Sequence, residues 1–179
     1  MSTARRSTQK HDRHANPAKH ERDCTPGTPF SLSWRRLGWF IATVISASFV
    51  LNETWEMAQM SAYVQTAGYP WMDTLGRCTK AALGDVGIIL GIYLTCSLVA
   101  RDLRWGLRAG PEIFAAAAAV GLAYAVLVEH FGLLAGRWSY TERMPVVPAL
   151  GAGLWPLLQM TLLPPLIFAL AKWWIGRRP

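Results

Sequence analysis

Three apolar runs in this chain are each too short to cross a membrane, and all three fall short at the same side. Leu37–Leu51, Val86–Ala100 and Ile113–Val128 hold 15, 15 and 16 residues without a charge, whereas a membrane-spanning helix needs roughly 20 residues. Each helix must therefore continue into the ionisable residues at one of its ends. Those side chains would lie inside the membrane, where charge is costly and is kept for pairing, for function or for both.

The composition favours a membrane protein over a soluble domain. Apolar residues make up 52% of the chain and charged residues 16%, whereas an average soluble domain is about 25% charged. A fourth run, Val146–Ala171, has 26 residues without a charge. We therefore expect an all-α, polytopic membrane protein, with a four-helix transmembrane bundle in residues 34–179. The expected helices cover about 37–60, 78–100, 111–131 and 155–175.

Residues 1–33 differ from the rest of the chain. They are polar and basic, contain three prolines and show no apolar period, which predicts a disordered cytoplasmic tail. The three histidines and Cys24 of this segment fit no zinc-binding spacing. The chain also has no phosphate-binding glycine loop and no dinucleotide-binding fingerprint. The sequence therefore predicts neither a metal site nor a cofactor.

Basic residues gather on one side of the predicted spans. Residues 1–36, 101–110 and 172–178 hold 14 of the 18 lysines and arginines. The other side holds Arg77, Lys80, Arg137 and Arg143. Because basic loops favour the cytoplasmic side, we expect both termini in the cytoplasm. This topology accounts for the net charge of +7, so membrane lipid, and not nucleic acid, is the expected partner.

Polar side chains gather at the opposite, outward side. On the first helix, Asn52, Glu56 and Gln59 share one face at 100° per residue. Asp85 lies about two turns inside the second helix, and Glu129 ends a face of small residues on the third. We expect Glu56 and Glu129 in one outward-facing cluster, with Asp85 beneath or beside it. Lipid cannot satisfy such groups, so they must face the bundle interior or a wet cavity.

The candidate site residues follow from this convergence. Acids and bases in a partly dry pocket suit proton transfer, and the candidates for catalysis are Glu56, Asp85, Glu129 and His130. Arginine suits phosphate or carboxylate groups, and Trp and Tyr favour the membrane interface. The candidates for ligand binding are Asn52, Glu53, Gln59, Arg137, Trp138, Tyr140, Arg143 and Gln159.

Two features of the sequence predict how the helices pack. Gly84, Gly87 and Gly91 form a smooth strip on the second helix, and small residues allow membrane helices to approach closely. Asp85 lies beside that strip. Its nearest basic neighbours in the sequence, Arg77 and Lys80, are not at the favourable spacing of four residues, so a partner from another helix is equally open. The segment 146–153 is expected to be re-entrant or interfacial and to cover the polar site.

Several blocks of sequence carry a resemblance to a known group of proteins. The blocks are Asn52–Gln59, Cys78 with Gly84-Asp85, Glu129, Gly136–Tyr140 with Met144-Pro145, and Leu154–Gln159. Together they resemble a group of small, uncharacterised bacterial membrane proteins with four spans, over about residues 37–170. The resemblance implies a four-span fold in a bacterial inner membrane. It implies no activity, and the basic tail lies outside it.

Three interpretations of the polar cluster remain open at this stage. The buried acids could pair with basic side chains and lock the four helices together without further function. They could bind or process a lipid-linked or amphiphilic ligand, because functional sites concentrate buried ionisable groups. They could also transport protons or ions, with the protein acting as an oligomer. Against transport, the inner halves of the helices lack ionisable residues and the chain shows no internal repeat.

Overall fold

Four long helices dominate the part of the chain that the structure describes. The structure is a computed structural model, and it describes the backbone of residues 29–177 and the side chains of residues 34–177. The long helices are α1 (Pro29–Gln59), α2 (Trp71–Ala100), α4 (Pro111–Leu134) and α5 (Leu154–Gly176). Each is long and apolar enough to cross a membrane. The predicted all-α, multi-pass architecture is therefore confirmed.

Short elements connect these helices. A 3₁₀ turn, η2 (Met60–Ala62), follows α1, and a single helical turn, α3 (Trp105–Arg108), lies between α2 and α4. Two short strands, β1 (Val146–Val147) and β2 (Ala152–Gly153), pair antiparallel between α4 and α5, with Val146 opposite Gly153. The segment expected to be re-entrant or interfacial forms a small hairpin. It packs on α4 and α5.

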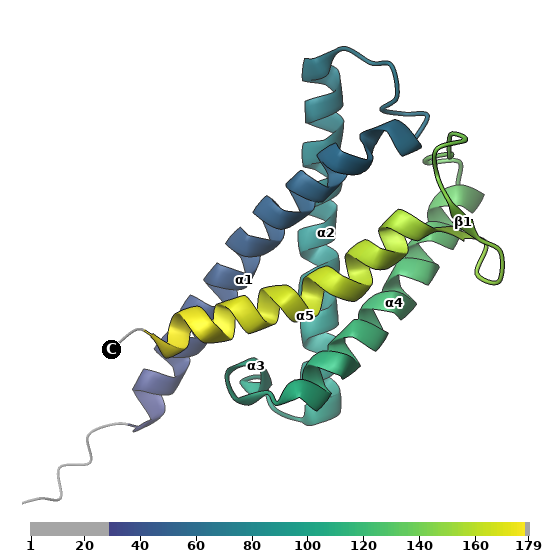
Figure 1. The fold of residues 1–179 in the computed structure, drawn as a ribbon. Helices are drawn as coiled ribbons and strands as arrows, with labels where there is room; N and C mark the ends of the chain where they lie inside the picture. Colours follow the sequence, from purple (N-terminus) through teal and green to yellow (C-terminus); the bar gives the residue numbers. More distant parts are fainter. Residues whose placement is uncertain (1–28, 178–179) are drawn as a thin grey trace, which may run out of the picture.

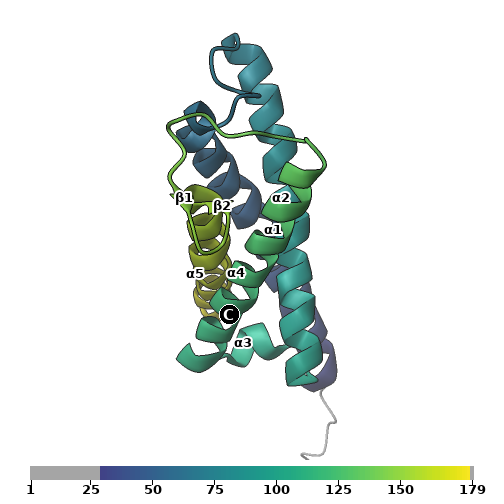
Figure 2. The same ribbon diagram turned by 90° about the vertical axis from the view of Figure 1, so that its right-hand side faces the viewer.

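The chain passes back and forth along the bundle. Both views place the α1–α2 connection and the two strands at one end, and α3 with the last turn of α5 at the other (Figure 1 and Figure 2). We call these the strand end and the α3 end. Helix α1 packs on α2 and α5, and α4 packs chiefly on α5. This topology separates Arg77, Lys80, Arg137 and Arg143, at the strand end, from the other described basic residues.

Two helices begin earlier than the sequence predicts. Helix α1 begins at Pro29, so it takes in the last residues of the predicted tail; residues 1–28 lie outside the described part of the chain. Helix α2 begins at Trp71, directly after Pro70. The sequence analysis placed this start near residue 78, and the turns that the structure adds contain the charged residues Asp73 and Arg77. Both side chains are exposed, and a helix end at the membrane surface accommodates charge there.

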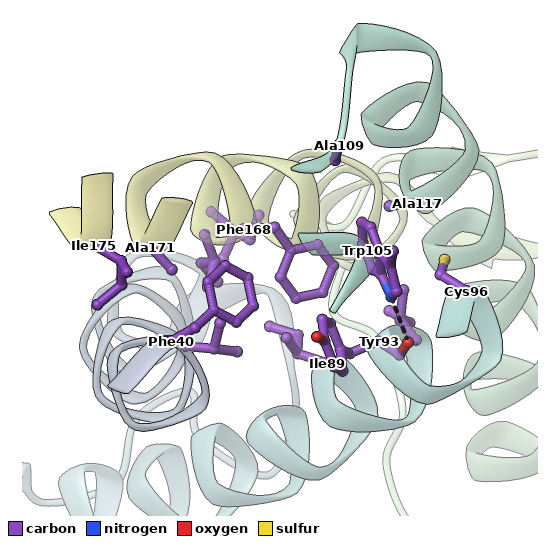
Figure 3. Packing of buried hydrophobic residues seen from close by; sticks show 14 residues of the cluster. Phe40, Ile89, Tyr93, Cys96, Trp105, Ala109, Ala117, Phe168, Ala171 and Ile175 are labelled. Atoms are coloured by element: carbon purple, nitrogen blue, oxygen red, sulfur yellow. Dashed lines mark hydrogen bonds between the residues drawn. The ribbon is translucent and has the colours of Figure 1, made fainter. Parts of the chain in front are cut away.

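An aromatic core fills the α3 end. Trp105 stacks on Tyr93 with ring centroids 5.1 Å apart, and it meets the edge of Phe168 at 5.4 Å. Phe40 of α1 completes the group, as Figure 3 shows. The Trp105 Nε1–H donates to Ser97 Oγ at 3.0 Å, so its one polar atom is satisfied. This packing leaves the α3 end dense and apolar.

Of the glycines in the predicted strip on α2, Gly91 meets a neighbouring helix, because its Cβ position lies 3.5 Å from the Tyr124 ring of α4. Gly84 and Gly87 are exposed, and a Cβ added at either would meet no atom within 4 Å. A Cβ added at Gly121 of α4 would instead lie 1.9 Å from the carbonyl oxygen of Met160 on α5. Pro164 has no N–H to donate to that carbonyl, so the freed oxygen faces the neighbouring helix. Glycine at 121 allows α4 and α5 to touch there.

Candidate functional site

A cavity of about 490 Å³ opens at the strand end of the bundle. Residues of α1, α2, α4 and α5 line it together with the segments that follow α1 and α4. Its acidic lining residues are Glu56, Asp85 and Glu129, and its basic lining residues are Arg77, Lys80 and Arg137. The predicted grouping of Glu56, Asp85 and Glu129 is therefore confirmed. The volume lies in the range of small-molecule sites.

Gln159 joins three helices at the floor of this cavity. Its side-chain nitrogen lies 2.9 Å from Asn52 Oδ1, 2.9 Å from Asp85 Oδ2 and 3.2 Å from Glu56 Oε1. An amide has two N–H donors, so three acceptors share them. Gln159 is 2% exposed. The partner that Asp85 takes from another helix is thus a neutral amide.

Gln59 extends this arrangement along α1. Its amide nitrogen donates to Glu56 Oε1 at 2.8 Å and to Gln159 Oε1 at 3.2 Å. Its own oxygen accepts from Trp55 Nε1 at 3.2 Å. Asn52, which is fully buried, donates to the carbonyl of Ser48 at 2.7 Å. The stripe read from α1 is therefore a connected hydrogen-bond network that faces α5.

Glu129 is held by the segment that follows α4. Its Oε2 accepts hydrogen bonds from the Tyr140 hydroxyl and, at 3.4 Å, from Trp138 Nε1. The Trp138 ring lies over Gly132, where an added Cβ would come within 1.9 Å of it. Tyr140 also accepts from the Gly153 N–H at 2.9 Å, which ties the β2 strand to the same point. Glu129 is consequently 4% exposed.

At the strand end, the segment that follows α1 is hydrogen-bonded to the segment that follows α4. Val64 N donates to Ser139 O and Thr141 N donates to Ala62 O, both at 3.0 Å. Between these bonds the rings of Tyr63 and Tyr140 lie 5.7 Å apart. Burial, together with the charge of Glu129, raises the pKa of Tyr63. Burial and the hydrogen bond to Glu129 raise the pKa of Tyr140, so its hydroxyl stays protonated and continues to donate.

No salt bridge joins an acid of the cavity to a basic residue among residues 34–177. Ion pairs in this part of the chain join Asp102 to Arg104 and Arg108, at the α3 end. Arg77 instead lies over the ring of Tyr69, 4.5 Å from its centroid. The ion-pair lock proposed from the sequence requires pairs between these acids and basic residues. Neutral amide, indole and hydroxyl donors hold the acids instead.

The remaining predicted residues lie around the cavity. Gln59, Arg137, Trp138 and Gln159 line it. His130 is exposed outside the lining, with Nδ1 2.8 Å from the carbonyl of Val126. Arg143 is also exposed and outside the lining. Glu53 accepts from Thr79 Oγ1 at 3.0 Å, away from the lining, while its Oε2 is buried without a partner.

Among the lining residues that the candidate set from the sequence omits are Arg77 and Lys80, whose charge marks them, and Tyr63 and Cys78. Each carries a signal in the sequence. Tyr63 continues the stripe of Glu56 and Gln59, and Cys78 precedes Asp85 by two helical turns, which puts both on one face. Cys78 is 2% exposed, so it lies at the back of the cavity wall.

Comparison with known proteins gives no match to a family model, to a curated protein or to a solved structure. No group of three or more His, Cys, Asp or Glu within the described residues is arranged to hold a metal ion. The polar lining of the cavity consists of carboxyl, amide, phenol, indole and basic side chains.

Proposed function

We propose that this protein binds the headgroup of a lipid or another amphiphile in the cavity at the strand end. The observation that carries the proposal is the lining itself. Three carboxyls and three basic side chains face one space of about 490 Å³ without pairing among themselves in the described part of the chain. Ionisable groups kept at membrane depth without mutual pairing suit a ligand that supplies the missing charges.

The contrast with the rest of the bundle supports binding over transport. Between the cavity and α3 lies the cluster of Phe40, Ile89, Ile92 and Phe168, each fully buried. A proton or ion path would need water or ionisable groups through this layer. The apolar walls of the cavity, among them Ile88, Val128 and Met160, suit the apolar part of an amphiphile.

We further propose a bacterial inner-membrane location with both termini in the cytoplasm. The split of 14 basic residues against four supports this orientation, and the resemblance to bacterial four-span proteins supports the location. A cysteine introduced at Ser139, with Cys24 as the internal control, tests it in intact cells. An impermeant maleimide should label residue 139 and leave Cys24 unlabelled. The reverse pattern would falsify the orientation.

The test of binding uses a native cysteine as a reporter. Cys24→Ser/Cys96→Ser leaves Cys78 as the sole thiol, in the cavity lining. Cys24→Ser/Cys78→Ser leaves Cys96, which is also buried but lies outside the lining. Added phospholipid in mild detergent should slow N-ethylmaleimide labelling of Cys78 and leave that of Cys96 unchanged. Equal effects at both thiols, or none at either, would contradict binding in this cavity.

Catalysis on such an amphiphile is a second candidate, favoured by one observation. Glu56 and Asp85 bond the same amide nitrogen of Gln159, so two carboxyls are neighbours in one cavity. Such a pair can divide the roles of general acid and general base. Mass spectrometry of phospholipids incubated with the purified protein tests this candidate. Unchanged lipids alongside protected Cys78 would leave binding alone as the function.

A further inference from the structure

We propose that the cavity selects a zwitterionic amphiphile whose protonated primary amine lies against Glu56 and Asp85 and whose anionic group lies against Arg77, Lys80 and Arg137. A phospholipid with an ethanolamine headgroup has this chemistry. The inference rests on the proposed binding function and adds the polarity and the orientation of the ligand.

The first argument concerns the free oxygens of the two carboxyls. Glu56 accepts its hydrogen bonds at Oε1, from Gln59 and Gln159, and Asp85 accepts at Oδ2, from Gln159. The second oxygen of each, Oε2 and Oδ1, accepts no hydrogen bond from the described residues and is not fully enclosed. Both residues line the cavity. A primary ammonium has three N–H donors and no acceptor, so it can donate to the free oxygen of each carboxyl.

The second argument concerns charge. Two neighbouring carboxyls in a space of low dielectric repel each other when both are ionised. In a soluble core, a lysine or arginine from the same chain would compensate them. Here Gln159 occupies the position between them, and the described basic residues form no ion pair with them. The cation is therefore expected from the ligand.

The third argument concerns the opposite side of the cavity. Arg77, Lys80 and Arg137 line the same space and are exposed, so they lie at its mouth. The contact with Tyr69 fixes the Arg77 guanidinium, and the bond from Arg137 N to Gly132 O at 2.9 Å fixes the backbone of Arg137. Guanidinium groups bind phosphate oxygens well. Acids at the floor and bases at the mouth orient a zwitterion with its amine inward.

This arrangement discriminates among common headgroups. A phosphatidylglycerol headgroup brings the phosphate but no cation for the floor. A trimethylammonium group brings the charge but no N–H donor. An N-acylated ethanolamine keeps the phosphate and loses the charged amine. The cavity should therefore prefer the free primary amine to all three.

The decisive experiment compares these lipids on the full chain in mild detergent. Protection of Cys78 from maleimide and native mass spectrometry measure binding of phosphatidylethanolamine, its N-acyl derivative, phosphatidylcholine and phosphatidylglycerol. We expect at least tenfold weaker binding of the N-acyl derivative, of phosphatidylglycerol and of phosphatidylcholine than of phosphatidylethanolamine. Equal binding of these four lipids would overturn the amine assignment and leave the proposed amphiphile binding standing. Absence of binding by every lipid would overturn both.

A pair of double variants tests the two acids. Glu56→Gln/Asp85→Asn removes both carboxyl groups from the floor and keeps the side-chain shapes. Asp73→Asn/Glu142→Gln removes two charges from exposed positions outside the lining. We expect the first variant to lose the preference for the free amine and the second to keep it. Preference retained by a folded first variant would reject the inference. If that variant does not fold, the lipid comparison on the unchanged chain decides.

Discussion

The two ends of this bundle solve the same problem, holding four membrane helices together, in opposite ways. At the α3 end, Trp105, Tyr93 and Phe168 interlock, and Asp102 pairs with arginines. At the strand end, amide side chains bridge the helices, the acids lack cations and about 490 Å³ stays open. Open space and uncompensated charge both cost stability. One end is thus built for packing, and the other keeps features that packing alone does not require.

The largest expected effect lies at the α3 end. Phe168→Ala should lower the free energy of unfolding by about 3–5 kcal/mol, because it leaves a cavity in a fully buried aromatic cluster. Thermal unfolding in detergent measures the loss. At a temperature where the variant is folded, phospholipid should still protect Cys78. If the variant keeps the free energy of unfolding of the unchanged protein but lipid no longer protects Cys78, the two ends do not have separate roles in stability and binding.

A smaller loss is expected at the hub of the strand end. Gln159→Leu removes the amide that joins Asn52, Glu56 and Asp85. The acceptors left without a donor should cost about 1–3 kcal/mol of the free energy of unfolding. The cavity allows water to hydrate the two carboxyls, so the loss should be below that of Phe168→Ala. A larger loss than at Phe168 would show that the strand end carries most of the stability.

The third prediction concerns the contact of Tyr140 with Glu129 and with the β2 strand, beside the cavity. Tyr140→Phe removes the hydroxyl that donates to Glu129 and accepts from Gly153 N. We expect a loss of about 1–2 kcal/mol, because the N–H of buried Gly153 is left without a partner. Maleimide labelling of Cys78 should become faster, because the segment that follows α4 is held less tightly over the cavity. Tyr124→Phe, which removes a hydroxyl 3.1 Å from Thr95 Oγ1 and outside the cavity lining, is the matched control and should leave that rate unchanged.

The sequence and the structure agree on residues whose exposure to lipid would cost much free energy. Charges at Glu56, Asp85 and Glu129 are too expensive to face lipid, so their helical spacing alone predicts that they meet. The partners could not be predicted, because an amide such as Gln159 forms equally good bonds with many acceptors. The glycine strip on α2 predicted a helix contact that is present at Gly91 and absent at Gly84 and Gly87, for a related reason. Small residues permit close packing without requiring it, and the contact at Gly121 depends on the carbonyl of Met160 that Pro164 leaves free.

The smallest effect on stability is expected at Glu129, and it separates structure from function most cleanly. In Glu129→Gln the amide oxygen can still accept from Tyr140 and Trp138, and no cation of the described chain loses a partner. The free energy of unfolding should therefore change by about 1 kcal/mol or less. In an ion-pair lock the same change would leave a buried cation without its partner and cost about 3–5 kcal/mol.

Thermal unfolding distinguishes these values, and co-purified lipid measured on the same sample reports binding. We expect normal accumulation in the membrane with reduced lipid, because the cavity loses one of its three carboxyl groups. Marked destabilisation with lipid retained would assign Glu129 to the framework of the bundle and remove it from the site.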